Sequence, residues 1–162
     1  MNKICTHEKF LPKLASTLKE LGFIQIKNRY FYIEYKKFFL IIWYRKHTFI
    51  NNMFLLDFGL FFKKLGRYRV PPVETKKWHL DLTFNDGRVF RSWLEKKDEI
   101  ECEQILLNIK KKILECLFPF IEKFKANKFI IGSGKSFRCV DFHSNKGQFG
   151  HERVLKFLRE EY

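Results

Sequence analysis

The stretch YFYIEYKKFFLIIWYRKHTFINNMFLLDFGLFF, residues 30–62, decides the fold of this 162-residue chain. It is the most aromatic and β-branched part of the sequence, and it contains no proline and one glycine, Gly59. Such side chains favour strands because they pack well on a pleated surface. We therefore predict that this stretch forms two or three neighbouring strands at the centre of an antiparallel sheet, which the flanking segments cover or extend.

Segments with the pattern of strands recur through this stretch and beyond it. Polar pairs such as Lys36-Lys37 and Asn51-Asn52 separate them and indicate turns. The residues NDG at 85–87 are typical of a tight turn, so we expect a hairpin between the two strands that flank them. The predicted strands comprise residues 23–26, 30–35, 38–45, 53–62, 78–84, 89–93, 129–131 and 137–142.

Apolar residues at helical spacing predict two main helices, one on each side of the central strands. The first comprises residues 7–21. The second runs from residue 99 to about residue 124 and begins at a capping box formed by Asp98 and Glu101. Pro119 is expected to kink this longer helix or to divide it in two.

The order of the elements is a helix, several strands, a long helix and a small tail with a last short helix at residues 151–160. This order predicts an α+β fold. We expect a mostly antiparallel sheet of about five to seven strands, covered on one face by the N-terminal helix and the long, proline-kinked helix. Without an internal repeat or a linker, the chain is most simply a single domain, residues 1–162.

The composition excludes two classes of protein. Hydrophobic residues make up 46% of the chain and aromatic residues 18%, which excludes a largely disordered protein. No apolar run approaches the roughly 20 residues that span a bilayer, and the N-terminus lacks the features of a signal peptide. We therefore predict a cytoplasmic protein with no membrane partner.

The four cysteines, Cys5, Cys102, Cys116 and Cys139, are widely spaced and form no CxxC pair. No histidine lies at a zinc-finger spacing from them. Cys102 and Cys116 lie roughly 21 Å apart along one predicted helix, so they cannot bridge each other. We expect free, reduced thiols, with a zinc site as the less favoured alternative.

Basic residues outnumber acidic ones by 32 to 18, which gives a net charge of +14. Residues 1–81 contain 16 of the basic and only 6 of the acidic residues. Such a charge favours acidic partners, namely nucleic acid, an anionic membrane or an acidic protein. The basic residues are mostly lysine, beside abundant Ile, Phe and Asn, so the base composition of an AT-rich genome is an equally good explanation.

Two segments, LKELGFIQIKNRYFYIEYKK at 18–37 and MFLLDFGLFF at 53–62, resemble an uncharacterised bacterial family, domain of unknown function 4304. ILECLFPFIEKF, residues 113–124, resembles the later helix of that family with its internal proline. The basic segment 63–77 has no counterpart there. The family has no established activity, so the resemblance implies no functional residues. Some small α+β families of this kind act as immunity proteins beside toxin genes.

The segment GSGKS, residues 132–136, resembles the end of a phosphate-binding P-loop. A P-loop needs a further glycine where Phe129 stands and a helix directly after the serine. The residues that follow are typical of a strand, so a hairpin turn is the favoured interpretation. Neither serine lies in the GxSxG context of a nucleophile. We therefore favour a protein that is not an enzyme and expect no cofactor.

Asp141 and His143 lie two residues apart on a predicted strand, and His79 and Asp81 repeat this spacing on another. Residues two apart share one face of a strand, so adjacent strands would bring four titratable side chains together. Such a set suits a metal ion or a proton relay, as in a metal-dependent hydrolase. Polar residues on an exposed strand face explain the same pattern without any site.

Basic residues gather at the ends of the predicted strands and in the loops between residues 27 and 77. This surface would suit an acidic protein, since complementary charge raises the association rate. Tyrosines interleave with the basic residues, so the surface would also suit single-stranded nucleic acid, although core packing accounts for most of the aromatic residues. The candidate binding residues are Lys27, Arg29, Lys36, Lys37, Arg45, Lys46, Lys63, Lys64, Arg67, Arg69, Lys76 and Lys77.

These observations favour a non-enzymatic protein that binds an acidic protein partner. Its sharpest form is an immunity or antitoxin protein that neutralises a toxin by charge-complementary binding. Nucleic-acid binding through residues 27–77 is the alternative, and a metal-dependent hydrolase is the second alternative. The partner's identity and the oligomeric state do not follow from the sequence.

Overall fold

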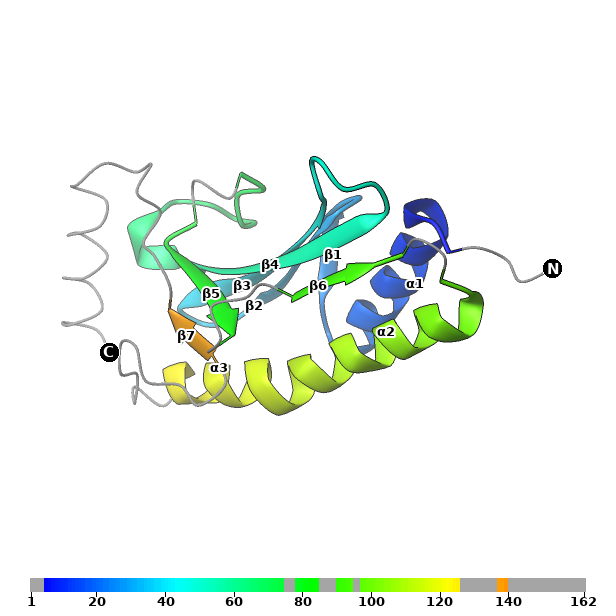
Figure 1. Ribbon diagram of the computed structural model, residues 1–162. Coiled ribbons are helices and arrows are strands. Elements are labelled where there is room, and N and C mark those ends of the chain that lie inside the picture. Colours follow the sequence, from blue (N-terminus) through cyan, green and yellow to red (C-terminus); the bar gives the residue numbers. More distant parts are fainter. Residues whose placement is uncertain (1–4, 75–77, 85–89, 95–96, 126–136, 140–162) are drawn as a thin grey trace.

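The computed structural model describes residues 5–74, 78–84, 90–94, 97–125 and 137–139. It confirms the α+β fold, with an antiparallel sheet lying on a layer of helices (Figure 1). None of the helices in these ranges combines the length and the apolar character that crossing a membrane requires.

The sheet has seven strands in the order β1-β2-β3-β4-β5-β7, and β6 pairs with β4 beside this path. Each of the described pairs is antiparallel. The two longest strands, β3 and β4, pair along their whole length in the centre, as residues 30–62 predict. The strands are β1 (Ile24–Lys27), β2 (Tyr30–Glu34), β3 (Phe38–Lys46), β4 (Met53–Phe62), β5 (Leu80–Phe84), β6 (Phe90–Trp93) and β7 (Phe137–Cys139).

The outer edge of β4 is shared by two strands. β5 pairs with residues 58–60 of β4, and β6 pairs with residues 53–56. The predicted hairpin between β5 and β6 is therefore wrong: both run in the same direction along one edge of β4. The physical reason is the length of β4, because ten residues offer enough backbone donors and acceptors for two short strands. The other edge of β5 pairs with β7.

The helices cover one face of the sheet, which is the lower face in Figure 1. α1 (His7–Glu20) lies beside α2 (Glu99–Lys112), which continues through the π-helical turn η3 (Ile113–Leu117) into α3 (Phe118–Lys125). The predicted capping box is present, since the Glu101 amide donates to Asp98 Oδ1 at 2.9 Å and the Asp98 amide donates to Glu101 Oε2 at 3.0 Å. Pro119 follows the π-helical turn, so one widened turn accommodates it without a break in the helix.

The two faces of the central strands carry separate apolar clusters. Leu40 and Ile42 on β3 belong to the large cluster between the sheet and the helices. Phe39 and Ile41 alternate with them and pack with the fully buried Trp78 on the opposite face. The helices cover one face, as predicted, and the segment that follows β4 covers part of the second face.

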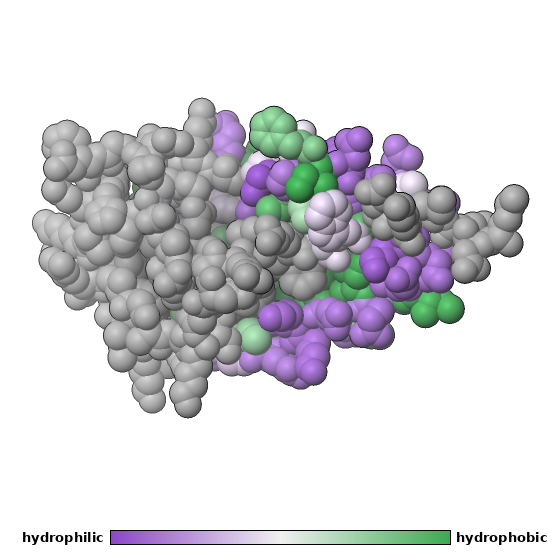
Figure 2. All heavy atoms as spheres, viewed as in Figure 1, coloured by the Kyte–Doolittle hydropathy of each residue, from purple (hydrophilic) through white to green (hydrophobic). Residues whose placement is uncertain are grey.

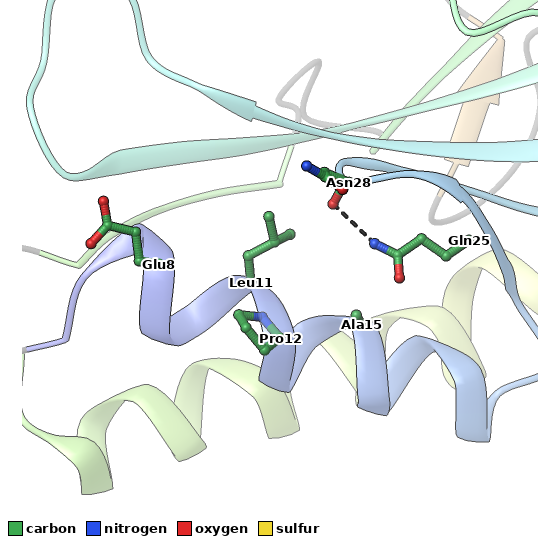
Figure 3. A pocket seen from close by; sticks show the side chains of 6 residues that line it. All are labelled: Glu8, Leu11, Pro12, Ala15, Gln25 and Asn28. Carbon is green, nitrogen blue, oxygen red and sulfur yellow. Dashed lines mark hydrogen bonds between the residues drawn. The ribbon is translucent and has the colours of Figure 1, made fainter.

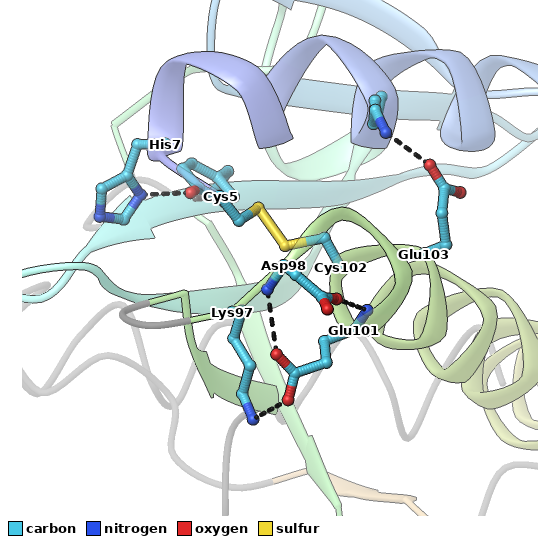
Figure 4. The surroundings of a disulfide bond; sticks show 9 residues. Cys5, His7, Lys97, Asp98, Glu101, Cys102 and Glu103 are labelled. Atoms are coloured by element: carbon cyan, nitrogen blue, oxygen red, sulfur yellow. Dashed lines mark hydrogen bonds and ion pairs between the residues drawn. A yellow bond between two sulfur atoms is a disulfide. The ribbon is translucent and has the colours of Figure 1, made fainter. Parts of the chain in front are cut away.

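A disulfide joins Cys5, just before α1, to Cys102 in the first turn of α2 (Figure 4). Both residues are buried, and the Cys5 amide donates to the Lys97 carbonyl at 2.8 Å. The prediction of free thiols is therefore wrong for these two cysteines. The pair is 97 residues apart in sequence, and it is the packing of α1 beside α2 that brings it together. Cys116 is a free thiol.

We expect the Cys5–Cys102 disulfide to stabilise the fold because it restricts the unfolded chain. Replacing both cysteines by serine should lower the free energy of unfolding by about 2–4 kcal/mol, measured by urea titration. Cys116→Ser, at the free thiol, is the control and should cost less. Absence of a linked Cys5–Cys102 peptide from a digest of the non-reduced protein would contradict the pairing.

Trp78 packs on the backbone of β4 at Gly59, where a Cβ would lie 2.1 Å from the indole ring. We expect Gly59→Ala to lower the free energy of unfolding by about 1–3 kcal/mol, since it overpacks the core. Urea titration followed by fluorescence measures this. In a Trp78→Phe background the same substitution should cost less, because the smaller ring leaves room. An equal cost in both backgrounds would show that the contact is not the cause.

Candidate functional site

The structure divides the predicted binding residues into two groups at opposite ends of the central strands. Because β3 is nine residues long, the two ends lie roughly 27 Å apart. Arg67 and Arg69 are exposed in the segment after η1 (Lys63–Leu65), and Lys76 and Lys77 lie outside the described residues. We name the groups the Arg29 end, which contains Lys27, Arg29, Arg45 and Lys46, and the Lys36 end, which contains Lys36, Lys37, Lys63 and Lys64.

At the Lys36 end, the chain itself uses part of the positive charge. Lys63 Nζ lies 2.5 Å from Glu34 Oε1 and 5.0 Å from the centre of the Phe39 ring. The Lys63 amide also donates to the Lys37 carbonyl at 3.0 Å, which joins the end of β4 to the β2–β3 turn. Lys63 therefore contributes to the fold and has less capacity for an outside partner.

At the Arg29 end, Arg45 is the cation that forms an ion pair within the described residues. Arg45 donates from Nε and Nη2 to the two carboxylate oxygens of Asp57, at 2.8 and 3.2 Å. The side chains of Lys27, Arg29 and Lys46 are exposed, and within the described part of the chain no carboxylate pairs with them. The Tyr44 amide donates to the Arg29 carbonyl at 2.8 Å, which fixes the backbone of the β1–β2 turn beside β3. This end therefore presents uncompensated positive charge on a rigid support.

Burial and the positive charge of the Arg29 end lower the pKa of His7. Its Nδ1 shares a hydrogen bond with the hydroxyl of the buried Tyr44. Burial lowers the pKa of His7 first, and the positive charges of Lys46 and Arg29 lower it further. Burial also raises the pKa of Tyr44, so the pair is neutral at physiological pH. Neutral His7 adds no charge, so Lys27, Arg29 and Lys46 carry the positive charge of this end.

Sequence reasoning missed Phe49, whose side chain is 91% exposed in the turn between β3 and β4. This turn follows Lys46 directly, so Phe49 lies at the Arg29 end. His47 Nδ1 accepts from the amides of Phe49 and Ile50 at 3.2 and 3.0 Å, and Asn52 adopts a left-handed φ of 57°. The turn is therefore ordered by its own hydrogen bonds. The available signal was an aromatic residue inside a polar turn.

The surface view shows the same arrangement. In Figure 2 an apolar group stands out at the top of the molecule, above the connection between β3 and β4, with hydrophilic residues around it. An exposed ring amid exposed cations is the composition of a binding surface, because aromatic residues and arginine supply much of the energy of protein interfaces.

The interleaved tyrosines do not form a platform for stacking bases. Tyr30 stacks on Trp43 with the ring centres 5.5 Å apart and the planes at 3°, and Tyr32 packs edge-on against Phe39. Tyr44 is fully buried. These three rings pack within the sheet, so they offer little open face to the bases of single-stranded nucleic acid.

A shallow pocket of about 380 Å³ lies between α1 and the β1–β2 turn (Figure 3). Gln25 Nε2 donates to the Asn28 carbonyl across its rim at 3.1 Å. Glu8 is the one ionisable residue among those that line it. A single carboxylate with apolar neighbours supplies no acid–base pair, so this pocket suggests no catalysis.

One residue of the predicted metal site, His79, belongs to the buried interior. His79 is buried, and its Nδ1 accepts from the Phe62 amide at 2.8 Å while its ring stacks on Phe61. β5 and β7 are adjacent, as the hypothesis requires, but Asp141 and His143 lie outside the described residues, as does the segment 132–136. In the ranges that the structure covers, no three His, Cys, Asp or Glu residues come together to hold a metal.

Comparison of the chain with family models, with curated proteins and with solved structures gave no match. The resemblance to domain of unknown function 4304 therefore stays a prediction. What the site does has to be argued from its geometry.

We expect His7 to make the fold less stable as the pH falls. Its pKa is lower in the folded protein than in the unfolded chain, so below about pH 6.5 the unfolded chain binds the proton more readily. His7→Gln should flatten the fall in the free energy of unfolding between about pH 7 and pH 5 relative to the wild type. Urea titrations across this range measure it. Parallel curves for the two proteins would contradict the lowered pKa.

Proposed function

We propose that this protein is a non-enzymatic binding protein that docks an acidic protein partner on the Arg29 end, with Phe49 as the apolar anchor. One observation carries the proposal. Three exposed cations, Lys27, Arg29 and Lys46, lack a carboxylate partner in the described residues, and they share one end of the sheet with a 91% exposed aromatic ring.

The two parts of this surface have different roles in binding. The cations attract an acidic surface and raise the association rate. Phe49 is removed from water in the complex, and such a ring gains most when it fills a pocket of the partner. Its turn is already ordered by His47, so little conformational entropy is lost on binding.

A protein partner fits this geometry better than nucleic acid does. Tyr30 and Tyr32, which would stack on bases, pack against Trp43 and Phe39, and the projecting ring of Phe49 suits a pocket in a protein surface. The sharpest form of the proposal is an immunity or antitoxin protein that blocks a toxin. Its support is the positive charge, the compact fold and the analogy with small α+β immunity families.

Charge reversal at the Arg29 end, compared with charge reversal elsewhere on the surface, tests the proposal. The variant Lys27→Glu, Arg29→Glu, Lys46→Glu should reduce capture of an acidic protein from a lysate of the source cell by about tenfold or more, and Phe49→Ser should do the same. The control, Lys36→Glu, Arg67→Glu, Arg69→Glu, has the same net charge as the first variant and should retain capture. Quantitative mass spectrometry of nuclease-treated eluates is the measurement.

Two results would count against the proposal. Equal loss in both charge variants would mean that net charge, and not the Arg29 end, controls binding. Retained capture by Phe49→Ser would remove the anchor. Direct titration with labelled single- and double-stranded DNA and RNA completes the test, since binding that weakens steeply with salt would favour the nucleic-acid alternative.

A further inference from the structure

The long helix carries an exposed apolar line on its outer side. Ile100, Leu107 and Leu114 are 80%, 58% and 46% exposed. They are seven residues apart, which is almost two full helical turns, so they align along the helix. Leu114 lies in η3, which continues α2 as one helix in Figure 1.

This line is separate from the core. The residues of α2 that pack on the sheet are buried and lie on the other side of the helix, namely Cys102, Ile105, Leu106 and Ile109. In Figure 1 the helix forms the lower border of the molecule, with the sheet above it. Apolar residues that repeat every seven positions on a free helix face are typical of a helix–helix contact.

We propose that this line docks on α2 of a second copy of the chain, antiparallel and about a two-fold axis at Leu107. Equal spacing on either side of Leu107 makes the line self-complementary. Each Ile100 then lies opposite Leu114 of the second copy, and the two Leu107 side chains meet at the axis. A two-fold interface requires this kind of self-complementarity. The inference does not rest on the proposed function.

Charge selects the antiparallel orientation. Glu103 and Lys110 are also seven residues apart and lie on one flank of the line, so an antiparallel pair places Glu103 beside Lys110 of the second copy. A parallel pair would instead place this flank beside the opposite flank of the second copy, so Glu103 and Lys110 would not meet. Both side chains remain accessible, at 56% and 40%, although each contacts α1 of its own chain. Within each chain, Glu103 pairs with Lys13 at 2.6 Å and Lys110 pairs with Glu20 at 3.3 Å. Across the interface the charges would therefore alternate, with Lys13 and Glu103 from one copy followed by Lys110 and Glu20 from the other.

Sedimentation velocity over a wide range of concentration tests for the dimer. The wild type should form dimers as its concentration rises. Leu107→Glu should raise the dissociation constant by about tenfold or more, because it places two like charges at the axis. Asn108→Glu, at an exposed neighbour off the line, is the matched control and should change it by less than about threefold. A wild type that stays monomeric, or equal effects of the two variants, would overturn the proposal.

Crosslinking with a short bis-maleimide tests the orientation, in a Cys116→Ser background. Ile100→Cys alone should give no crosslinked dimer above that background, since the two positions 100 lie roughly 21 Å apart along the helix axes of the antiparallel pair. Mixing Ile100→Cys with Leu114→Cys should give the crosslinked dimer. Crosslinking of Ile100→Cys with itself, or no product from the mixture, would overturn the antiparallel arrangement.

Discussion

Burial of β3 and β4 on both faces is the constraint on which the rest of the structure depends. Alternating side chains are apolar on either side of these strands, so two layers have to cover them. The helices form one layer, and Trp78 over Gly59 forms part of the other. Trp78 Nε1 donates to the Pro72 carbonyl at 2.9 Å, which fixes the covering segment. With both faces of these strands covered, the strand ends remain accessible to a partner.

The strand ends then differ in how the chain uses their cations. Arg45 and Lys63 serve the fold, since Arg45 pairs with Asp57 on the neighbouring strand β4 and Lys63, just after β4, pairs with Glu34 on β2. Ion pairs near the surface contribute little to stability, but they occupy the charge. Lys27, Arg29 and Lys46 have no such role in the described residues, so their charge is available to a partner. Net charge alone does not make this distinction, because it counts all cations equally.

Local patterns predicted the elements, and non-local contacts account for what sequence reasoning missed. The strand 53–62 and the Asp98 capping box follow from alternation and from a four-residue motif, and the structure confirms both. The β5–β6 hairpin failed because the long edge of β4 competes for the same strands. The pairing of Cys5 with Cys102 depends on how helices pack. Separation of the basic residues into two ends likewise needs the strand register.

The packing of α1 beside α2 also sets the order in which the chain is able to fold. α1 is made first, but its ion-pair partners on α2 follow 90 residues later. Until α2 leaves the ribosome, the aromatic side of β2, β3 and β4 lacks most of its cover. Such separation in sequence slows folding, because long loops must close before the contacts form. A nascent chain that stops before residue 99 would therefore be a substrate for chaperones, and α2 is the element that begins to supply the rest of the cover on this side of the sheet.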